Sequence, residues 1–389
     1  DDAVRRYLWT DSFAVFALLG LYRHTGNQEY LGWARRLVEL VHHVLGRYRR
    51  DDPRSGWISG LSELEGERRP TLGGLRIGKP LPERRPCEPY DEHLEWERDG
   101  QYFHYLTKWM HSLTCMSAAT HDPRYIGQAA DLARAAGRAF VYAPRGLGFK
   151  RMYWKMSTDL ARPLVLSMGQ LDPLDGLVTF SRIRAAQRLP DQRTIDLDHA
   201  IGDMRHICEE IPSWATPDPL GIGGLLTEAG GLLQLIVSGD RDLDTLLRRL
   251  LADSERSVQA YLTSGDYAAP CESRLAFREL GLSIGLQSLG PMHAAIEHHP
   301  DRFGGPLAAG ALVARTKSLL RFAPLAEHLE QSWLTPAAQS SANWTAHLDI
   351  NSVMLAASLI PEAYLLLCSP EPPDDPHGAE VRCSKGLSK

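Results

Sequence analysis

The chain has 389 residues, of which 43% are hydrophobic and 23% are charged, and its formal net charge is -5 at pH 7. This composition can bury a large core, and the near-neutral balance argues against a polyanion-binding protein, so we expect no nucleic-acid partner. Because the apolar runs are short and broken by Gly or polar residues, we expect no transmembrane helix and no membrane partner. The six cysteines are far apart and form no C-x-x-C pair, which favours a reduced, cytoplasmic setting without structural zinc.

The first expected helix runs from about Asp11 to His24 and has apolar residues on every side, which predicts that it is buried all round. The helix after it has a single apolar stripe, because Leu31, Ala34 and Val38 recur at steps of three and four. A buried helix followed by a surface helix predicts an αα-hairpin.

A pattern T-x-[ND]-x-x-Y-[LI]-G-x-A occurs at Thr25 and again at Thr120, with a weaker echo at Ser238. In each case an apolar helix precedes the pattern and a more polar helix follows it, which predicts short hairpin turns on one face of the molecule. No single hairpin can cover its own apolar helix, whereas hairpins stacked into a closed ring can. Six inner helices are expected, beginning near Asp11, Gly100, Ser157, Gly224, Ser273 and Asp349.

Long Gly/Pro-rich stretches separate each outer helix from the next inner helix, at 48–98, 143–155, 212–222, 264–272 and 335–348. Long ordered loops are usually functional, and these share the face opposite the short turns. The fold class predicted is all-α: a single (α/α)6 toroid of about six helical hairpins over residues 1–368. A disordered C-terminal tail is expected over residues 369–389, which are rich in Pro, Gly and charge.

This alternation resembles the (α/α)6 toroid of the six-hairpin glycosidases and the N-acylglucosamine 2-epimerases, over roughly residues 7–368. The resemblance rests on the hairpin pattern and not on a signature motif. The segment Glu95–Gln101 is similar to the Trp-Arg-Gly-Asn-Gly segment that opens an inner helix in unsaturated-glucuronyl hydrolases, but its residue order differs. No catalytic assignment is therefore carried over, and the resemblance implies only an enzyme that acts on carbohydrates.

Acidic residues gather where the second inner helix begins, and the other inner helices also open with polar groups. A ring would point all these helix starts at one mouth, where two carboxylates could flank a glycosidic bond. The candidates are Glu95, Glu97 or Asp99 for one carboxylate, Asp159, Glu272 or Asp349 for the other, and His104 as a further acid or base. The alternative is structural, because acids complement a helix dipole and Asp11, Ser157, Ser273 and Asp349 are natural N-caps.

Aromatic, basic and polar residues near the same mouth are candidates for substrate binding, since flat Trp faces suit sugar rings and Arg or Lys can orient an acidic substituent. The expected set is Trp9, Asp11, Trp57, Arg76, Lys79, Trp96, Gln101, Tyr102, Tyr105, Trp154, Arg274, Arg278, Trp344, His347 and Asn351. The segment Gly73–Lys79 matches the phosphate-binding loop pattern, but Pro80 replaces the Ser or Thr that binds magnesium. We therefore expect no cofactor and no metal.

The leading prediction is a carbohydrate-active enzyme, a glycoside hydrolase with paired carboxylates whose substrate is a sugar or oligosaccharide, with an acidic sugar among the candidates. The first alternative is a sugar epimerase or isomerase in which two of His104, His111 and His347 move protons at carbon. A terpene-cyclase-like enzyme and a non-enzymatic toroid that binds a glycan or peptide are further alternatives. The lining of the central cavity distinguishes these readings, while the oligomeric state and the native N-terminus stay open.

Overall fold

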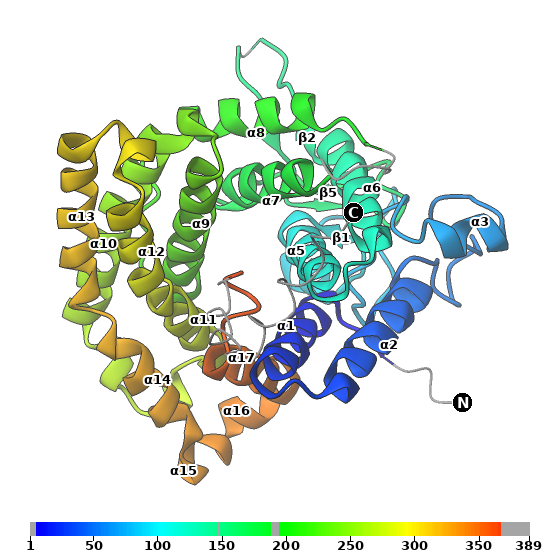
Figure 1. The fold of residues 1–389 in the computed structure, drawn as a ribbon. Coiled ribbons are helices and arrows are strands. Elements are labelled where there is room, and N and C mark those ends of the chain that lie inside the picture. Colours follow the sequence, from blue (N-terminus) through cyan, green and yellow to red (C-terminus); the bar gives the residue numbers. More distant parts are fainter. Residues whose placement is uncertain (1–4, 147, 188–193, 367–389) are drawn as a thin grey trace, which may run out of the picture.

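The computed structural model describes residues 5–146, 148–187 and 194–366. Six inner helices in this part of the chain form a ring: α1 (Leu8–Thr25), α5 (Phe103–Thr120), α7 (Asp172–Ala186), α9 (Pro219–Val237), α11 (Ala276–Gln287) and α17 (Leu348–Leu359). Each packs against the next and α17 packs back against α1, so the ring closes (Figure 1). The predicted all-α (α/α)6 toroid is therefore confirmed, whereas the predicted tail over 369–389 lies outside the described residues.

The outer layer covers this ring with α2 (Gln28–Leu45), α6 (Pro123–Phe140), α8 (Asp198–Glu210), α10 (Asp244–Ser264), α13 (Pro306–Leu320) and α14 (Pro324–Leu334). α2 buries its predicted stripe, including Leu31, Ala34 and Val38, against α1. α12 (Leu289–His298) prolongs α11 beyond Ser288. Within the described residues no outer helix follows α17, which instead packs against α14, the outer helix that precedes it in the chain.

The repeated sequence motif forms the same turn twice, between α1 and α2 and between α5 and α6. Gly26 and His121 adopt left-handed backbone conformations, with φ of 69° and 55°. The side chains of Asn27 and Asp122 then accept a hydrogen bond from the backbone two residues further on, which caps the outer helix. The motif thus encodes a hairpin turn, as its position between an apolar and a polar helix predicted.

The third inner helix begins at Asp172, so the predicted start near Ser157 is wrong. The Ser157 hydroxyl donates to the Asp159 carboxylate and accepts from the Arg162 backbone amide, which closes a turn between two strands instead of capping a helix. Pro163 follows directly and cannot continue a helix. The strands are β1 (Gln101–Tyr102), β4 (Lys155–Met156) and β5 (Pro163–Val165), antiparallel in the order β1-β4-β5, and the pair β2 (Val141–Tyr142) and β3 (Arg151–Met152).

The remaining short elements lie in the connections between the long helices. They are α3 (Glu63–Arg68), α4 (Glu92–Glu97), α15 (Pro336–Gln339), α16 (Ala342–Ala346), and the 3-10 turns η1 (Arg241–Leu243), η2 (Asp266–Ala268), η3 (Cys271–Ser273) and η4 (Pro300–Phe303). α3, α4 and strands β1, β4 and β5 lie in the connections that lead into α5 and α7, so these loops are ordered, as their length in a compact domain predicted.

The helix α9 is the most apolar of the long helices, and by length and composition it could cross a membrane, with a mean hydropathy of 1.6. The sequence-based expectation of no transmembrane helix rested on short apolar runs, and α9 is longer and more apolar than that reading allowed. However, 72% of this window is buried inside the protein, where α9 packs against α7, α10 and α11. An inner helix enclosed on all sides needs this composition because it has no face turned to water.

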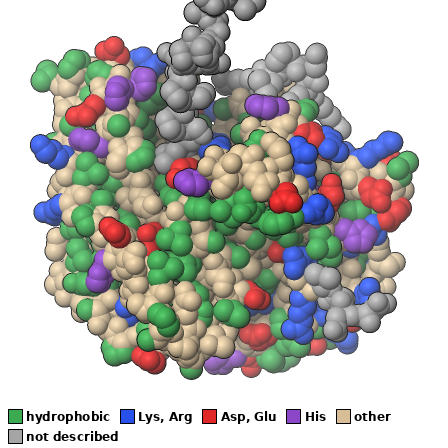
Figure 2. Space-filling view, turned by 60° about the horizontal axis from the view of Figure 1, so that its bottom comes forward, with side chains coloured by type: hydrophobic (Ala, Val, Ile, Leu, Met, Phe, Trp, Pro, Cys, Tyr) green, Lys and Arg blue, Asp and Glu red, His purple; other side chains and the backbone are tan. Residues whose placement is uncertain are grey.

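Charge on the visible surface is mixed. Figure 2 shows a face on which Lys and Arg side chains are interspersed with Asp and Glu and with apolar groups. No field of one sign dominates this face, as the net charge of -5 predicts.

Candidate active site in the centre of the ring

Two cavities lie inside the ring. The first, here called the mouth chamber, has a volume of about 270 Å³ and is lined by all six inner helices near the ends that follow the long loops. The second, the inner chamber, has a volume of about 320 Å³ and lies further along α5, α7 and α9. Lys108, Thr227 and Tyr364 line both cavities and form the boundary between them.

One wall of the mouth chamber is aromatic. Trp9 and Phe13 from α1 and Trp154 from the loop after β3 line it. Trp154 is stacked on the ring of His104, with 6.0 Å between the centroids and 12° between the planes. Flat apolar faces beside polar groups suit the binding of a sugar ring, although they also suit other small ligands.

Asp172 and His104 are neighbours in the lining of this chamber. Asp172 Oδ1 lies 3.7 Å from His104 Nδ1, which is too far for a hydrogen bond. Burial, assisted by the charge of Asp175, raises the pKa of Asp172 to about 8. Burial, assisted by Lys108, lowers the pKa of His104 to about 3. At neutral pH the Asp172 carboxyl therefore keeps its proton while the His104 imidazole is uncharged.

Both side chains also have unused hydrogen-bonding capacity. Among the described residues, His104 Nδ1 and Asp172 Oδ2 are buried and have no hydrogen-bond partner. Buried polar atoms in proteins are normally satisfied, so two unsatisfied atoms on residues that line the cavity are candidates for hydrogen bonds with a ligand. Gly169 makes the approach possible, because a Cβ atom there would lie 2.7 Å from the Asp172 carboxyl group.

A buried ion cluster lies at the boundary between the two chambers, with one member from each of α5, α7 and α9. Lys108 Nζ lies 3.3 Å from Asp175 Oδ2 and 3.4 Å from Glu228 Oε1. Burial raises the pKa of Glu228 to about 8, against the opposing effect of Lys108. Burial on its own would lower the pKa of Lys108, but Asp175 and Glu228 hold it above the usual value. The cluster thus fixes a charged ammonium at the centre of the ring.

Three of the predicted site residues line the mouth chamber: Trp9, His104 and Trp154. Tyr102 and Tyr105 lie behind them, with ring centroids 5.3 and 4.9 Å from that of His104. The sequence predicted aromatic binding residues near the starts of the inner helices, and Trp9, Tyr102 and Tyr105 lie at the starts of α1 and α5.

The acids favoured as the first catalytic carboxylate lie outside both chambers. Glu95 is buried against Lys155 at 3.0 Å and against Arg84 at 2.8 Å. Asp99 is fully buried and paired with Arg76 at 2.6 Å. Glu97 is exposed at the end of α4. Arg84 and Arg76, from the loop before α4, pair with these two buried acids. The contacts therefore agree with a structural role for Glu95 and Asp99, which the sequence left open as the alternative.

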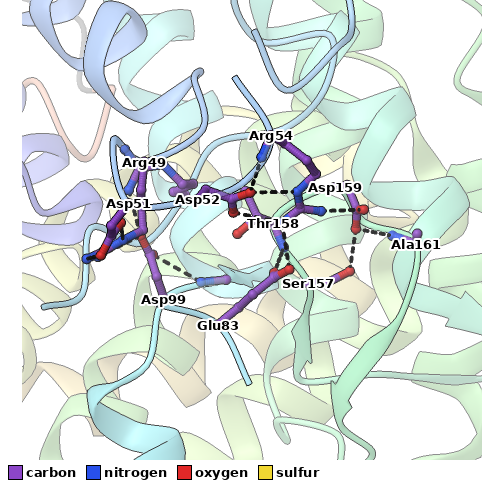
Figure 3. Close-up of polar contacts among 12 residues, drawn as sticks. Arg49, Asp51, Asp52, Arg54, Glu83, Asp99, Ser157, Thr158, Asp159 and Ala161 are labelled. Carbon is purple, nitrogen blue, oxygen red and sulfur yellow. Dashed lines mark hydrogen bonds and ion pairs between the residues drawn. The ribbon is translucent and has the colours of Figure 1, made fainter. Parts of the chain in front are cut away.

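The acids favoured as the second carboxylate also lie elsewhere. Asp159 belongs to a network of loop side chains in which Arg54 bonds to Asp159 and Glu83, both at 2.7 Å (Figure 3). Asp349 and Glu272 are exposed. No pair of the predicted carboxylates faces a common cavity, because these groups are paired within the loops or turned to the surface.

Several predicted binding residues serve the loops and helix starts. Gln101 bonds to the backbone of Gly73, Leu75 and Thr158. Asp11 accepts from the Tyr7 backbone amide, as in a capping box, and burial raises its pKa to about 6.

The other predicted binding residues also lie outside the two chambers, and we describe them by their contacts. Trp57 is buried beside Arg47, Lys79 is half-buried beside the Tyr7 ring, and Trp96 packs edge-on against Trp154. Arg76 pairs with Asp99, Arg274 with Glu279, and Arg278 with Asp218, which does line the mouth chamber. Trp344 stacks on Trp333, His347 is exposed beside Phe277, and Asn351 accepts from the Phe277 backbone amide.

The polar centre of the mouth chamber includes Asp172 and Asp175, which the sequence did not single out, together with Lys108. As for metals, the part of the chain that the structure describes contains no group of three His, Cys, Asp or Glu side chains that could hold an ion. The arrangement is suited to acid–base chemistry by side chains on a ligand held against an aromatic wall.

No protein-family model and no curated protein matches the chain. Among solved structures it is similar to the cellobiose 2-epimerase from Spirochaeta thermophila DSM 6192, with 11% sequence identity and a TM-score of 0.48 over 92% of this chain and 87% of that chain. The toroid is established by the closure of the ring described above, and no activity or site residue is taken from this likeness.

Proposed function

We propose that the chain is an enzyme that moves protons on a small carbohydrate, as a sugar epimerase or isomerase, in the mouth chamber. The observation that carries the proposal is the pair formed by Asp172, which holds a proton at neutral pH, and the uncharged His104. General acid–base catalysis needs one group that donates a proton and one that accepts it, both within reach of the substrate. The unpartnered atoms His104 Nδ1 and Asp172 Oδ2 supply these two roles.

In the proposed reaction the open-chain form of a reducing sugar lies against Trp9 and Trp154. His104 Nδ1 accepts the proton from the carbon next to the carbonyl, and the Asp172 carboxyl donates its proton to the carbonyl oxygen. The electron pair of the broken C–H bond forms the C=C bond of an enediol. Return of the proton from His104 to the opposite face of that carbon, which the enediol must turn toward the imidazole, gives the epimer, and return to the neighbouring carbon gives the ketose. In either case one enediol hydroxyl gives its proton back to the Asp172 carboxylate as the carbonyl forms again.

The acid–base pair differs from the His pair that the sequence suggested for this alternative. His111 lines the inner chamber and His347 is exposed, so neither shares the mouth chamber with His104. Asp172 takes the place of the second histidine, because burial gives this carboxyl a pKa of about 8, close to the range in which a histidine would work.

Glycoside hydrolysis is the second candidate, and the protonated Asp172 favours it, since a glycosidase also needs a general acid. It needs in addition an ionised carboxylate that acts as base or nucleophile on the opposite side of the bond. The two other acids that line the mouth chamber are both paired with cations: Asp175 Oδ2 lies 3.3 Å from Lys108 Nζ, and Asp218 Oδ1 lies 2.8 Å from Arg278 Nη1. A carboxylate engaged in this way is less available as a nucleophile, so the geometry supports proton transfer better than hydrolysis.

The two candidates are distinguished by incubating the protein in D2O with reducing monosaccharides and with β-linked disaccharides such as cellobiose. Epimerisation or isomerisation exchanges the proton next to the carbonyl for deuterium, which removes its NMR signal, and the new sugar appears with an intact glycosidic bond. Hydrolysis releases monosaccharides without this exchange. We expect exchange, and we expect His104→Gln and Asp172→Asn to slow it about 10²- to 10⁴-fold.

The control for these variants is His347→Gln, which changes an exposed histidine outside the chamber and should leave the rate unchanged. Release of monosaccharide without exchange would replace the epimerase by the hydrolase. Neither exchange nor cleavage nor saturable binding of any sugar would contradict a carbohydrate substrate altogether.

A further inference from the structure

The inner chamber contains a cation that the proposed reaction does not use. The chamber is lined by α5, α7, α9 and α12 and by residues 364–366, which follow α17 and turn into the middle of the ring (Figure 1). Arg182, on α7, is part of this lining and lies two turns beyond Asp175 along the same helix. The volume of the inner chamber, about 320 Å³, is within the range for small-molecule pockets.

The guanidinium group of Arg182 is held in a defined position. It donates a hydrogen bond of 2.6 Å to the side-chain oxygen of Gln234, and the Gln234 amide nitrogen donates in turn to the Leu365 carbonyl at 3.0 Å. Gly231 leaves the space that the guanidinium needs, because a Cβ atom at that position would lie 3.1 Å from Arg182 Nη2. A neutral amide thus orients the cation without neutralising it.

The charge of Arg182 has no close counter-charge. Within the described ranges, no carboxylate oxygen lies within the 4.0 Å that defines an ion pair with this guanidinium. The acid that also lines the chamber, Glu228, is engaged by Lys108, with 3.4 Å between Oε1 and Nζ, and burial raises the pKa of its carboxyl. A partly buried cation without a counter-charge is unfavourable, and an anion from outside would relieve this.

The neighbouring polar groups are compatible with an anion. His111 is uncharged, because burial lowers its pKa to about 3, and its Nε2 atom is bonded to the Tyr364 carbonyl at 2.6 Å. Thr179, one turn before Arg182, also lines this cavity. Lys108 at the boundary adds a second cation within the lining.

We propose that the inner chamber is a second binding site, which takes the carboxylate or phosphate group of a small molecule on Arg182. The planar guanidinium fork suits the two oxygens of such a group, which it can bind through parallel hydrogen bonds. The anion has two conceivable sources. It is a free metabolite that binds beside the reaction site, or it is the acidic substituent of a sugar whose other end lies in the mouth chamber. The shared boundary at Lys108, Thr227 and Tyr364 places the two chambers next to each other.

The proposed anion site is tested by measuring binding and not turnover. The result of this test therefore does not depend on whether the proposed epimerase reaction is correct. The full chain is titrated with sodium phosphate, and separately with malonate, by calorimetry and thermal unfolding at constant ionic strength and pH 7. We expect saturable binding that raises the melting temperature. Arg182→Met should weaken it about 10- to 100-fold, as expected for the loss of charge-assisted hydrogen bonds. Arg138→Met changes an exposed arginine on α6 and should leave it unchanged.

A second variant keeps the test decisive if Arg182→Met does not fold. Gln234→Glu places a carboxylate at the position that now accepts from Arg182, so the protein itself supplies the counter-charge. This variant should fold and should no longer bind phosphate, although it loses the hydrogen bond to Leu365. No saturable binding of either anion to the unmodified protein, or equal binding by Arg182→Met, Gln234→Glu and the unmodified protein, would overturn the proposal.

A third arm identifies the source of the anion. Glucuronate and glucose 6-phosphate are compared with inorganic phosphate and malonate on the same variants. Tighter binding of the acidic sugars that is weakened by both Arg182→Met and Trp154→Ala assigns Arg182 to a substrate that spans the two chambers. Binding of all anions that depends on Arg182 and not on Trp154 assigns it to a separate effector site.

Discussion

Replacing Asp172 by Asn should change the pH dependence of stability, and this prediction needs no substrate. Burial and the charge of Asp175 raise the pKa of Asp172 from 3.8 to about 8, against the backbone amide at Gly169 and the charge of Lys108. Asn has the shape of the protonated carboxyl group and cannot ionise. The difference in free energy of unfolding between the two proteins therefore reports the titration of this one side chain.

The sign and size of the effect follow from proton linkage. Between pH 3.8 and about 8 the native protein keeps the proton of Asp172 while the unfolded chain has lost it, so raising the pH favours the unfolded chain. Each pH unit in this window lowers the free energy of unfolding of the unmodified protein by about 1.4 kcal/mol relative to the variant. From pH 5 to pH 7 the relative loss is about 3 kcal/mol.

The assay is urea unfolding at pH 5, 6 and 7, followed by circular dichroism, on the unmodified protein and the variant. Titrations of other groups are common to both proteins and cancel in the difference. Asp301→Asn, at an exposed position on η4, is the matched control and should show a difference that does not change with pH. If the Asp172→Asn difference is also constant between pH 5 and pH 7, then Asp172 titrates normally, and its role as a proton donor at neutral pH falls with it.

Two further predictions concern the buried ion pairs. Lys108→Met removes the cation that Asp175 and Glu228 share, and it should lower the free energy of unfolding by about 3 to 5 kcal/mol at pH 7, as for other broken buried ion pairs. Urea unfolding measures this, and a change below about 1 kcal/mol would show that the cluster is not buried as described. Asp99→Asn leaves Arg76 without its carboxylate and should lower stability by a similar amount, about 3 to 5 kcal/mol, while any catalytic constant measured for the folded variant stays within about twofold. A loss of about 100-fold or more in that folded variant would restore Asp99 as a catalytic candidate.

The ring could be predicted because local patterns specify it. α1 is apolar on all sides and α2 has one apolar stripe, and this difference marks an inner and an outer helix without any knowledge of their neighbours. The turn motif at Thr25 and Thr120 gives the hairpins their register, since its Asn or Asp caps the outer helix in both copies. Both signals act within a few residues, which is the range over which a single sequence is informative.

The start of α7 was missed because a polar segment with a helix-like opening precedes it. Ser157, Thr158 and Asp159 have the composition of an N-cap, yet their hydrogen bonds close a turn between β4 and β5. Asp172-Pro173 carried the better signal, because Pro is favoured in the first turn of a helix. With α7 placed at Ser157, the sequence brought Asp159 to the mouth of the ring and left Asp172 unnoticed.

Lys108 and Glu228 could have been noticed but not paired from the sequence. Glu228 is the one charged residue in α9, and a lone charge in an apolar helix requires a partner. Which partner it meets depends on how α5 and α9 are rotated and shifted against each other across the ring. That register follows from packing between helices far apart in the sequence, and it leaves no trace in the local pattern.

The location of cations explains why the acids that were expected to be catalytic differ from the acids in the cavity. The long loop after α2 is rich in Arg and Lys, and Glu95 and Asp99 lie close to it in the chain, so they meet Arg84 and Arg76 and stay paired. Asp172 comes after this basic segment and reaches the mouth chamber with only a distant lysine, which is not enough to offset its burial. A buried carboxyl with no adjacent cation keeps its proton, and a proton held at neutral pH is what acid catalysis requires. Local charge pairing therefore removes acids from the chemistry, and the acids left unpaired in the hollow of the ring are the ones available for it.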